Sequence, residues 1–182
     1  RDNYLPVDKA LIQLTPPDEH GFMSFGVSVD YTLQAAVSAK AVIAEVNPQM
    51  PRTHGSFIHI DEVDLIVEVD YSIVEIPLPI ISTVEERIGK HVASLVPDRA
   101  NLQLGIGAIP DAALKFLNDK KDLGIHSEMF SDGVVDLYER GMVTNAYNNL
   151  NPGKFVASFL MGTKRLYNFV HDNPIVLMKP VD

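Results

Sequence analysis

Residues 101–117 read NLQLGIGAIPDAALKFL, and this stretch decides the fold class. An apolar segment, two glycines and an amphipathic run follow one another, which predicts a strand over 101–104, a turn, and a helix over 111–117. Pro110 is typical of the first turn of a helix, because an N–H there would have no partner within the helix. The stretch is therefore interpreted as a strand–turn–helix unit, the building block of α/β folds.

The same alternation continues to the end of the printed sequence. Further strands are predicted at 123–127, 155–160 and 175–178, and further helices at 132–140 and 164–170. Strands that alternate with short helices predict a parallel sheet covered on both faces, so the expected fold class is α/β.

The first half of the chain has the same character up to a proline-rich segment. A helix is predicted at 31–39 and strands at 11–14, 41–46 and 65–69, of which the last two are almost wholly apolar and therefore expected to be buried on both faces. Residues 71–82 show no clear period, so a boundary is placed there, between parts 1–81 and 82–182.

A helix follows this boundary and carries clear local signals. Ser82 and Glu85 have the spacing of a capping box, and Pro97 ends the helix. Its apolar residues fall on one face, which is expected to pack against the core; they are Val84, Ile88, Val92, Leu95 and Val96.

Composition excludes several classes of function. The chain has 24 acidic and 15 basic residues and a formal charge of −9, which disfavours nucleic acid and anionic membrane surfaces as partners. No apolar run approaches the ~20 residues that span a bilayer. The absence of cysteine excludes thiolate zinc sites and cysteine nucleophiles, and it fits a cytoplasmic protein. Three histidines of the first part of the chain, His20, His54 and His59, lack the spacing of a zinc motif, so no metal site is expected.

Two segments could carry chemistry. Gly105 and Gly107 would let the backbone approach a ligand, and the free amides of the following helix favour an anion such as a phosphate; the alternative is a tight turn without a ligand. The segment 124–133 places Glu128 at the carboxyl end of a strand, where ligands bind in α/β sheets, unless Glu128 is a solvated loop carboxylate. Asp132 is expected to cap the next helix, and His126 to be a packed core histidine.

A dinucleotide-binding fold is a specific alternative for the same two segments. Gly105 and Gly107 would then hold a pyrophosphate, and Glu128 would bind a ribose at about the usual offset. Pro110 stands where that fingerprint has a third glycine, which argues against it. The pattern of residues alone leaves both interpretations open.

Three motifs resemble the acetyl-CoA hydrolase/transferase family, and within it the 4-hydroxybutyrate and butyrate CoA-transferases. They are Pro17-Asp18-Glu19-His20-Gly21 with Gly26-Val27-Ser28, Leu104-Gly105-Ile106-Gly107-Ala108-Ile109-Pro110, and Gly124-Ile125-His126-Ser127-Glu128-Met129. The resemblance covers essentially the whole chain and implies a NagB/RpiA/CoA transferase-like fold. It implies that 1–81 is the C-terminal part of a first domain and 82–182 the N-terminal part of a second, catalytic one.

The resemblance also implies a reaction. Glu128 corresponds to the family's nucleophilic glutamate, which forms a glutamyl-CoA thioester while CoA moves between an acyl-CoA and a small carboxylate such as acetate. Coenzyme A is then a substrate, and no permanently bound cofactor is expected. The residues expected to bind substrate or CoA are Gly105, Ile106, Gly107, Ala108, Pro110, Met129, Gly133, His20 and His54. A homodimer or higher homo-oligomer is expected; the alternatives are an acyl-CoA hydrolase and a non-catalytic nucleotide-binding module.

Overall fold

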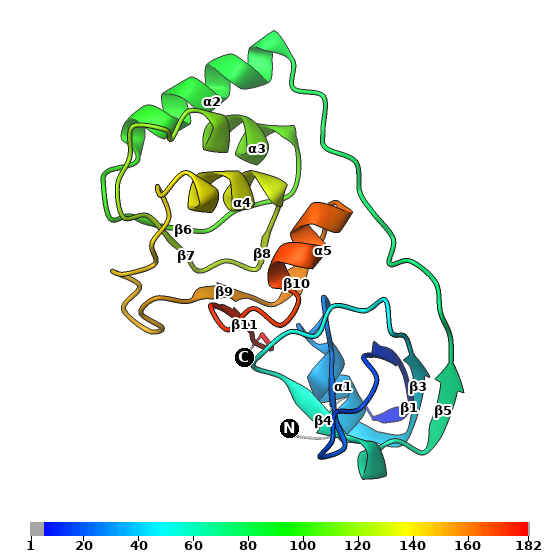
Figure 1. The fold of residues 1–182 in the computed structure, drawn as a ribbon. Coiled ribbons are helices and arrows are strands. Elements are labelled where there is room, and N and C mark those ends of the chain that lie inside the picture. The colour runs from blue at the N-terminus through cyan, green and yellow to red at the C-terminus, as the bar shows by residue number, and fades with distance from the viewer. Residues whose placement is uncertain (1–5, 182) are drawn as a thin grey trace.

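Two groups of strands and helices, joined by an extended segment, make up residues 6–181, which the computed structural model describes (Figure 1). The N-terminal lobe contains β1 (Val7–Leu14), β2 (Phe22–Ser24), α1 (Thr32–Ser38), β3 (Ala39–Val46), β4 (Phe57–His59), a 3₁₀ helix (Ile60–Glu62) and β5 (Leu65–Glu68). The C-terminal lobe contains α2 (Thr83–Leu95), β6 (Asn101–Leu102), α3 (Ala108–Lys115), β7 (Gly124–Ile125), β8 (Met129–Phe130), α4 (Asp132–Glu139), β9 (Phe155–Ala157), β10 (Phe159–Leu160), α5 (Lys164–Val170) and β11 (Val176–Met178). No helix in this part of the chain has the length and apolar character needed to cross a bilayer.

The predicted α/β class is confirmed, because most strand pairs are parallel. β1, β3 and β5 form a three-stranded parallel sheet in the order β1-β3-β5. In the C-terminal lobe β6 pairs with β7, β8 with β10, and β9 with β11, all in parallel. The exception among the paired strands is the antiparallel pair β2–β4.

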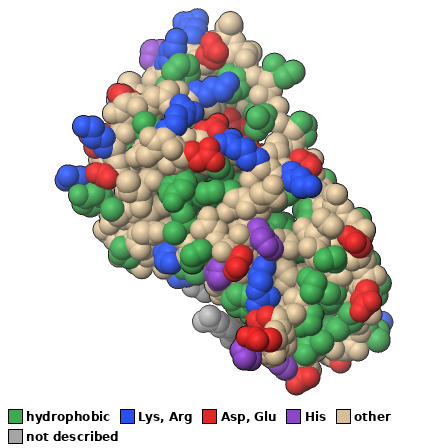
Figure 2. Space-filling view, in the orientation of Figure 1, with side chains coloured by type: hydrophobic (Ala, Val, Ile, Leu, Met, Phe, Trp, Pro, Cys, Tyr) green, Lys and Arg blue, Asp and Glu red, His purple; other side chains and the backbone are tan. Residues whose placement is uncertain are grey.

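The first sheet differs from its predicted burial. In β3 the alternate residues Val42, Ala44 and Val46 are buried, while their neighbours are only half-buried. All four residues of β5 are exposed, although their apolar run is typical of a strand buried on both faces. The cause is position, since β5 lies at the edge of the sheet and no other described element covers it. Hydrophobic side chains are accordingly visible on the surface of this lobe (Figure 2).

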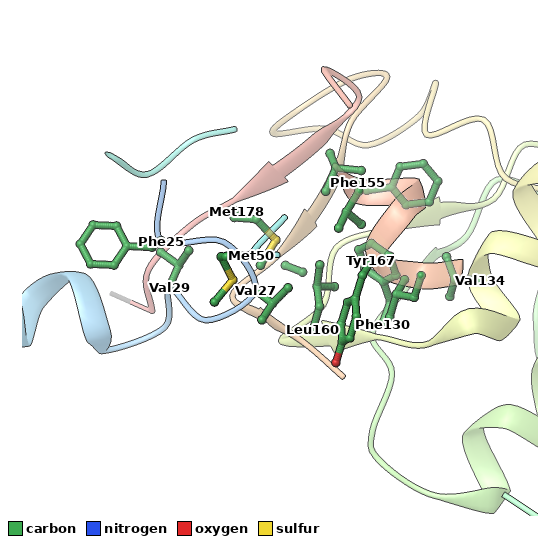
Figure 3. Close-up of a cluster of buried hydrophobic side chains, with 14 of the residues drawn as sticks. Phe25, Val27, Val29, Met50, Phe130, Val134, Phe155, Leu160, Tyr167 and Met178 are labelled. Atoms are coloured by element: carbon green, nitrogen blue, oxygen red, sulfur yellow. The ribbon is translucent and has the colours of Figure 1, made fainter. Parts of the chain in front are cut away.

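The two lobes share one hydrophobic core although the linker 69–82 separates them in sequence. The backbone N–H of Leu160 donates to the carbonyl of Val27 at 2.8 Å, and the N–H of Val29 donates to the carbonyl of Ser158 at 2.9 Å. Phe25 lies in the same buried cluster as these segments and the side chains of the C-terminal lobe (Figure 3). The residues around 25–29 are thus packed as part of both lobes.

Helix α2 has the predicted ends but not the predicted packing. The Ser82 N–H donates to Glu85 Oε2 at 2.6 Å, and the Glu85 N–H donates to Ser82 Oγ at 3.5 Å, which confirms the capping box. The helix packs through its small residues Gly89 and Ala93, and a Cβ on Gly89 would lie 2.7 Å from the Ala112 carbonyl carbon. The expected packing face is wrong, because four of its members are exposed: Val84, Ile88, Val92 and Leu95.

Asp132 does not cap α4, contrary to the prediction. Ser131 occupies the N-cap position, and Asp132 is only 3% exposed. Its carboxylate instead accepts two hydrogen bonds from Thr163, one from the backbone N–H at 2.9 Å and one from Oγ1 at 2.6 Å. Asp132 therefore fastens the start of α4 to the start of α5.

This arrangement predicts a large stability effect at Asp132. We expect Asp132→Ala to lower the free energy of unfolding by about 2–4 kcal/mol, because a buried charge-assisted pair is lost, rather than by the ~1 kcal/mol of a lost cap. Urea denaturation would measure it. Asp136→Ala is the matched control on the same helix, because Asp136 forms a surface ion pair with Arg165 and should cost less than about 1 kcal/mol. Equal losses in the two variants would contradict the assigned role.

Candidate functional site

A depression of about 670 Å³ lies at the carboxyl ends of the strands in the C-terminal lobe. This is the edge at which parallel α/β sheets usually bind ligands. Its polar lining comes from four strands and the loop before β9, and consists of Gln103, His126, Ser127, Glu128, Asn151, Ser158 and Lys179. Glu128 is the one carboxylate among the described residues that line it.

The register of the strands explains why residues far apart in sequence line this depression. Met129 pairs with Phe159, and Ala157 pairs with Met178. Continued by one position, this register places Glu128, Ser158 and Lys179 in a single row across three neighbouring strands. Since side chains in one row of a parallel sheet share a face, the three point to the same side.

Glu128 sits where the backbone leaves the regular ladder. Its carbonyl accepts hydrogen bonds from the backbone N–H groups of Ser158 at 2.8 Å and Phe159 at 3.1 Å. Its side chain is exposed to solvent in the depression. The backbone of Glu128 is thus held by the neighbouring strand while its side chain is exposed in the depression.

The glycine turn lies beside Glu128. Ser127 Oγ accepts a hydrogen bond from the Leu104 N–H at 2.8 Å and lies 3.2 Å from the Leu104 carbonyl, to which it donates. Leu104 is also bridged to Met129. The turn that starts at Gly105 is therefore fixed against the segment on both sides of Glu128.

Gly107 supplies the conformation that this turn needs. It precedes α3 with φ +125°, in a region that favours glycine, and a Cβ built on it would meet no atom within 4 Å. The turn Gly105-Ile106-Gly107 is exposed, and α3 begins directly after it at Ala108, with Pro110 in its first turn. Exposed amides at the start of a helix suit a developing negative charge.

A second, smaller pocket of about 120 Å³ lies next to the glycine turn. Met129, Gly105 and Gly107 line it together with the linker residues Ile76–Pro79. Glu128 lines the larger depression and Met129 lines the smaller pocket. The segment 128–129 therefore contributes to both.

The structure does not bring the predicted histidines to Glu128. His20 is exposed in the N-terminal lobe, where its Nε2 lies 3.6 Å from Glu19 Oε1. His54 pairs with β11, and its Nε2 lies 3.3 Å from Asp172 Oδ1. Neither residue lines the depression. Within residues 6–181 no three histidine or acidic side chains form a group that could hold a metal ion.

Two further predicted residues have different surroundings from those expected. His126 is exposed and lines the depression, so its interpretation as a core histidine is wrong. Gly133 lies at the contact between α4 and α3, where a Cβ would come within 2.9 Å of Leu114 Cδ1, so it permits close helix packing. It borders a separate pocket, away from Glu128.

Sequence reasoning missed the partners of Glu128 in the depression. Lys179, Ser158, Gln103 and Asn151 carry no motif. The strand register brings the first three to one place, and Asn151 comes from the loop before β9. A weak signal existed for Lys179, because it follows directly after the predicted strand 175–178 and so marks another carboxyl end.

The chain is similar to known CoA-transferases over its whole length. Residues 1–79 match the model of the acetyl-CoA hydrolase/transferase N-terminal domain. The chain is 57% identical over 183 residues to the 4-hydroxybutyrate coenzyme A transferase of Clostridium kluyveri, covering 100% of this chain and 43% of that protein. It is 39% identical over 188 residues to the butyryl-CoA:acetate CoA-transferase of Anaerostipes caccae, covering 99% of this chain and 42% of that protein.

A solved structure shows the same fold. The 4-hydroxybutyrate CoA-transferase of Porphyromonas gingivalis superposes with a TM-score of 0.96 at 49% identity, over 100% of this chain and 47% of that one. The chain thus spans less than half the length of the curated relatives and solved structures that it matches. The sequence identity, the fold and the matched domain therefore agree that the chain is similar over its whole length to members of the acetyl-CoA hydrolase/transferase family.

Proposed function

We propose that the full-length protein is a CoA-transferase, which moves CoA between an acyl-CoA and a small carboxylate, and that Glu128 is its nucleophile. The observation that carries this proposal is the position of Glu128. It is the one carboxylate among the described residues that line the depression, and the residues on both sides of it contact Leu104, which precedes the glycine turn. The names of the relatives support the reaction class, since they are called CoA-transferases.

The proposed reaction proceeds through two kinds of acyl intermediate. A Glu128 carboxylate oxygen attacks the thioester carbon of the acyl-CoA, the C–S bond breaks, and a mixed anhydride and the CoA thiolate result. The thiolate attacks the glutamyl carbon of the anhydride, which releases the first carboxylate and leaves a Glu128–CoA thioester. The acceptor carboxylate then reverses these steps and departs as the new acyl-CoA. A carboxylate needs no partner base for such an attack.

The glycine turn is the proposed source of transition-state stabilisation. Carboxylates are poor nucleophiles, so the negative charge that develops on the attacked carbonyl oxygen must be stabilised by preorganised donors. The exposed backbone at Gly105–Gly107 follows Leu104, which is bridged to Met129, the residue after Glu128, and it leads into the start of α3. A substitution that restricts the backbone of this turn should therefore reduce the rate of acyl-CoA turnover more than it reduces stability.

The names of the relatives and the position of the linker also suggest substrates, a domain division and an assembly. Acetate, butyrate and 4-hydroxybutyrate appear in the relatives' names, so short-chain acids are the proposed substrates, with CoA as substrate and not as a resident cofactor. We place the division between the first and second CoA-transferase domain in the linker 69–82, which has no regular secondary structure. A cytoplasmic homo-oligomer is the proposed form of the protein.

One experiment separates transfer from hydrolysis. Full-length protein is mixed with butyryl-CoA, with or without isotope-labelled acetate, and the CoA species are analysed by mass spectrometry. We expect labelled acetyl-CoA to appear with acetate, and butyryl-CoA to persist without it. Release of free CoA at the same rate in both samples would identify a hydrolase. Binding of NAD in calorimetry, with no turnover of acyl-CoA, would favour the nucleotide-binding alternative.

A further inference from the structure

Lys179 shares the depression with Glu128 but does not pair with it. It is the one lysine or arginine among the described residues that line the depression. In the row across the sheet, Ser158 stands between the two residues, and no ion pair forms between the charged groups of Glu128 and Lys179. A cation and a carboxylate therefore face the same space with one sheet position between them.

The position of Lys179 is fixed at both its backbone and its side chain. Its N–H donates to the Ala157 carbonyl at 2.9 Å, which extends the pairing of β9 and β11 by one residue. Its Nζ donates to Asn151 Oδ1 at 3.2 Å. An ammonium group has three N–H donors, so donors remain for a ligand after this hydrogen bond is made.

From this arrangement we propose that Lys179 binds the carboxylate of the acceptor acid and holds it beside Glu128; this inference rests on the proposed function. The acceptor is an anion approaching a chain with a formal charge of −9. The net negative charge of the chain repels this anion, and a fixed ammonium group in the depression attracts it locally. The charge-assisted hydrogen bond also orients the attacking oxygen.

The chemistry favours an acid over the phosphates of CoA as the ligand of Lys179. In the glutamyl-CoA thioester the sulfur is bonded to Glu128, and the long pantetheine arm carries the phosphates away from it. Lys179 lies only two sheet positions from Glu128, which is roughly 10 Å between backbones at the usual strand spacing. The exposed apolar side chains of Leu150 and Val181 line the same depression and suit the alkyl part of a short acid.

The test compares Lys179→Met with Lys179→Arg in the full-length protein. We expect Lys179→Met to raise the KM for acetate roughly tenfold, the size of a lost charge-assisted hydrogen bond, and to leave the KM for butyryl-CoA nearly unchanged. Lys179→Arg should restore most of the acetate affinity. Lys154→Met is the matched control, because Lys154 Nζ donates to the Pro174 carbonyl at 2.5 Å outside the depression.

Measuring the CoA adduct separates failure of the Lys179 proposal from failure of the proposed function. Formation of the CoA adduct from butyryl-CoA needs no added acceptor, so the adduct should still form in Lys179→Met. Its reversal by added butyrate is the same kind of step as acceptor attack, and it should need roughly tenfold more butyrate in Lys179→Met than in the unmodified protein. An acetate KM equal to that of Lys154→Met would overturn the proposal while leaving the proposed function intact. A raised KM for butyryl-CoA that disappears with butyryl-pantetheine would assign Lys179 to a CoA phosphate and also overturn it. Absence of any adduct in the unmodified protein would instead refute the nucleophile and this inference together.

Discussion

Glu128→Ala is expected to abolish CoA transfer and the covalent CoA adduct together. Removal of a nucleophile usually costs several orders of magnitude in rate, and we expect a loss of more than about 10³-fold. No neighbouring acid can replace it, since no other aspartate or glutamate of the described chain lines the depression. The unmodified full-length protein, mixed with acyl-CoA without an acceptor, should gain the mass of CoA on one peptide that contains Glu128.

Chemical reduction gives an independent measurement of the same intermediate. A thioester is reduced by borohydride and a free carboxylate is not, so borohydride should inactivate only protein that has been treated with acyl-CoA. Glu128→Gln keeps the shape of the side chain and should also be inactive, with an unchanged melting temperature. An adduct in Glu128→Ala, or an adduct mapped to another acid such as Glu19, would show that the nucleophile is assigned wrongly.

Gly107→Val should reduce catalysis by more than the same loss of stability does elsewhere in the chain. The substitution adds a branched side chain at φ +125° where the thioester is expected to approach the exposed turn, and no protein atom lies within 4 Å of the new Cβ. We expect kcat/KM for acyl-CoA to fall by about 10²-fold or more, the usual cost of disturbing an oxyanion donor. The strained backbone should cost about 1–3 kcal/mol of unfolding free energy.

Gly141 provides a matched control for this strain. It has φ +81°, and a Cβ built there would also meet no atom within 4 Å, but it lies in the turn after α4 and lines neither the depression nor the pocket at the glycine turn. Gly141→Val should therefore lose similar stability and retain activity. If Gly107→Val also retains activity while its melting temperature falls, the glycine is needed only for the shape of the turn.

Local signals in the sequence predicted those features that local physics determines. The strand–turn–helix around Gly105 and Pro110 and the capping box at Ser82 depend on residues within one turn of each other, and both are present in the structure. The predicted strand 123–127 is shorter in the structure, so Glu128 lies three residues beyond the carboxyl end of β7 and directly before β8. Its role as nucleophile remains a prediction from the family resemblance.

Features that depend on distant partners could not be predicted in this way. Asp132 has the local pattern of a cap, but its carboxylate bonds to Thr163, 31 residues later. The periodicity of α2 identifies an apolar face and says nothing about what covers it, and the helix instead packs where Gly89 allows close approach. Lys179 reaches the depression through strand register, which no short segment encodes.

The shared core of the two lobes has a consequence for synthesis on the ribosome. The N–H of Val29 and the carbonyl of Val27 find their partners in Ser158 and Leu160, which are translated about 130 residues later. At the ~5–20 residues per second of translation, the segment 25–29 waits many seconds with unpaired backbone groups and an uncovered Phe25. The nascent N-terminal lobe is thus a natural client for chaperones, and slowed elongation before residue 160 should lower the yield of folded protein.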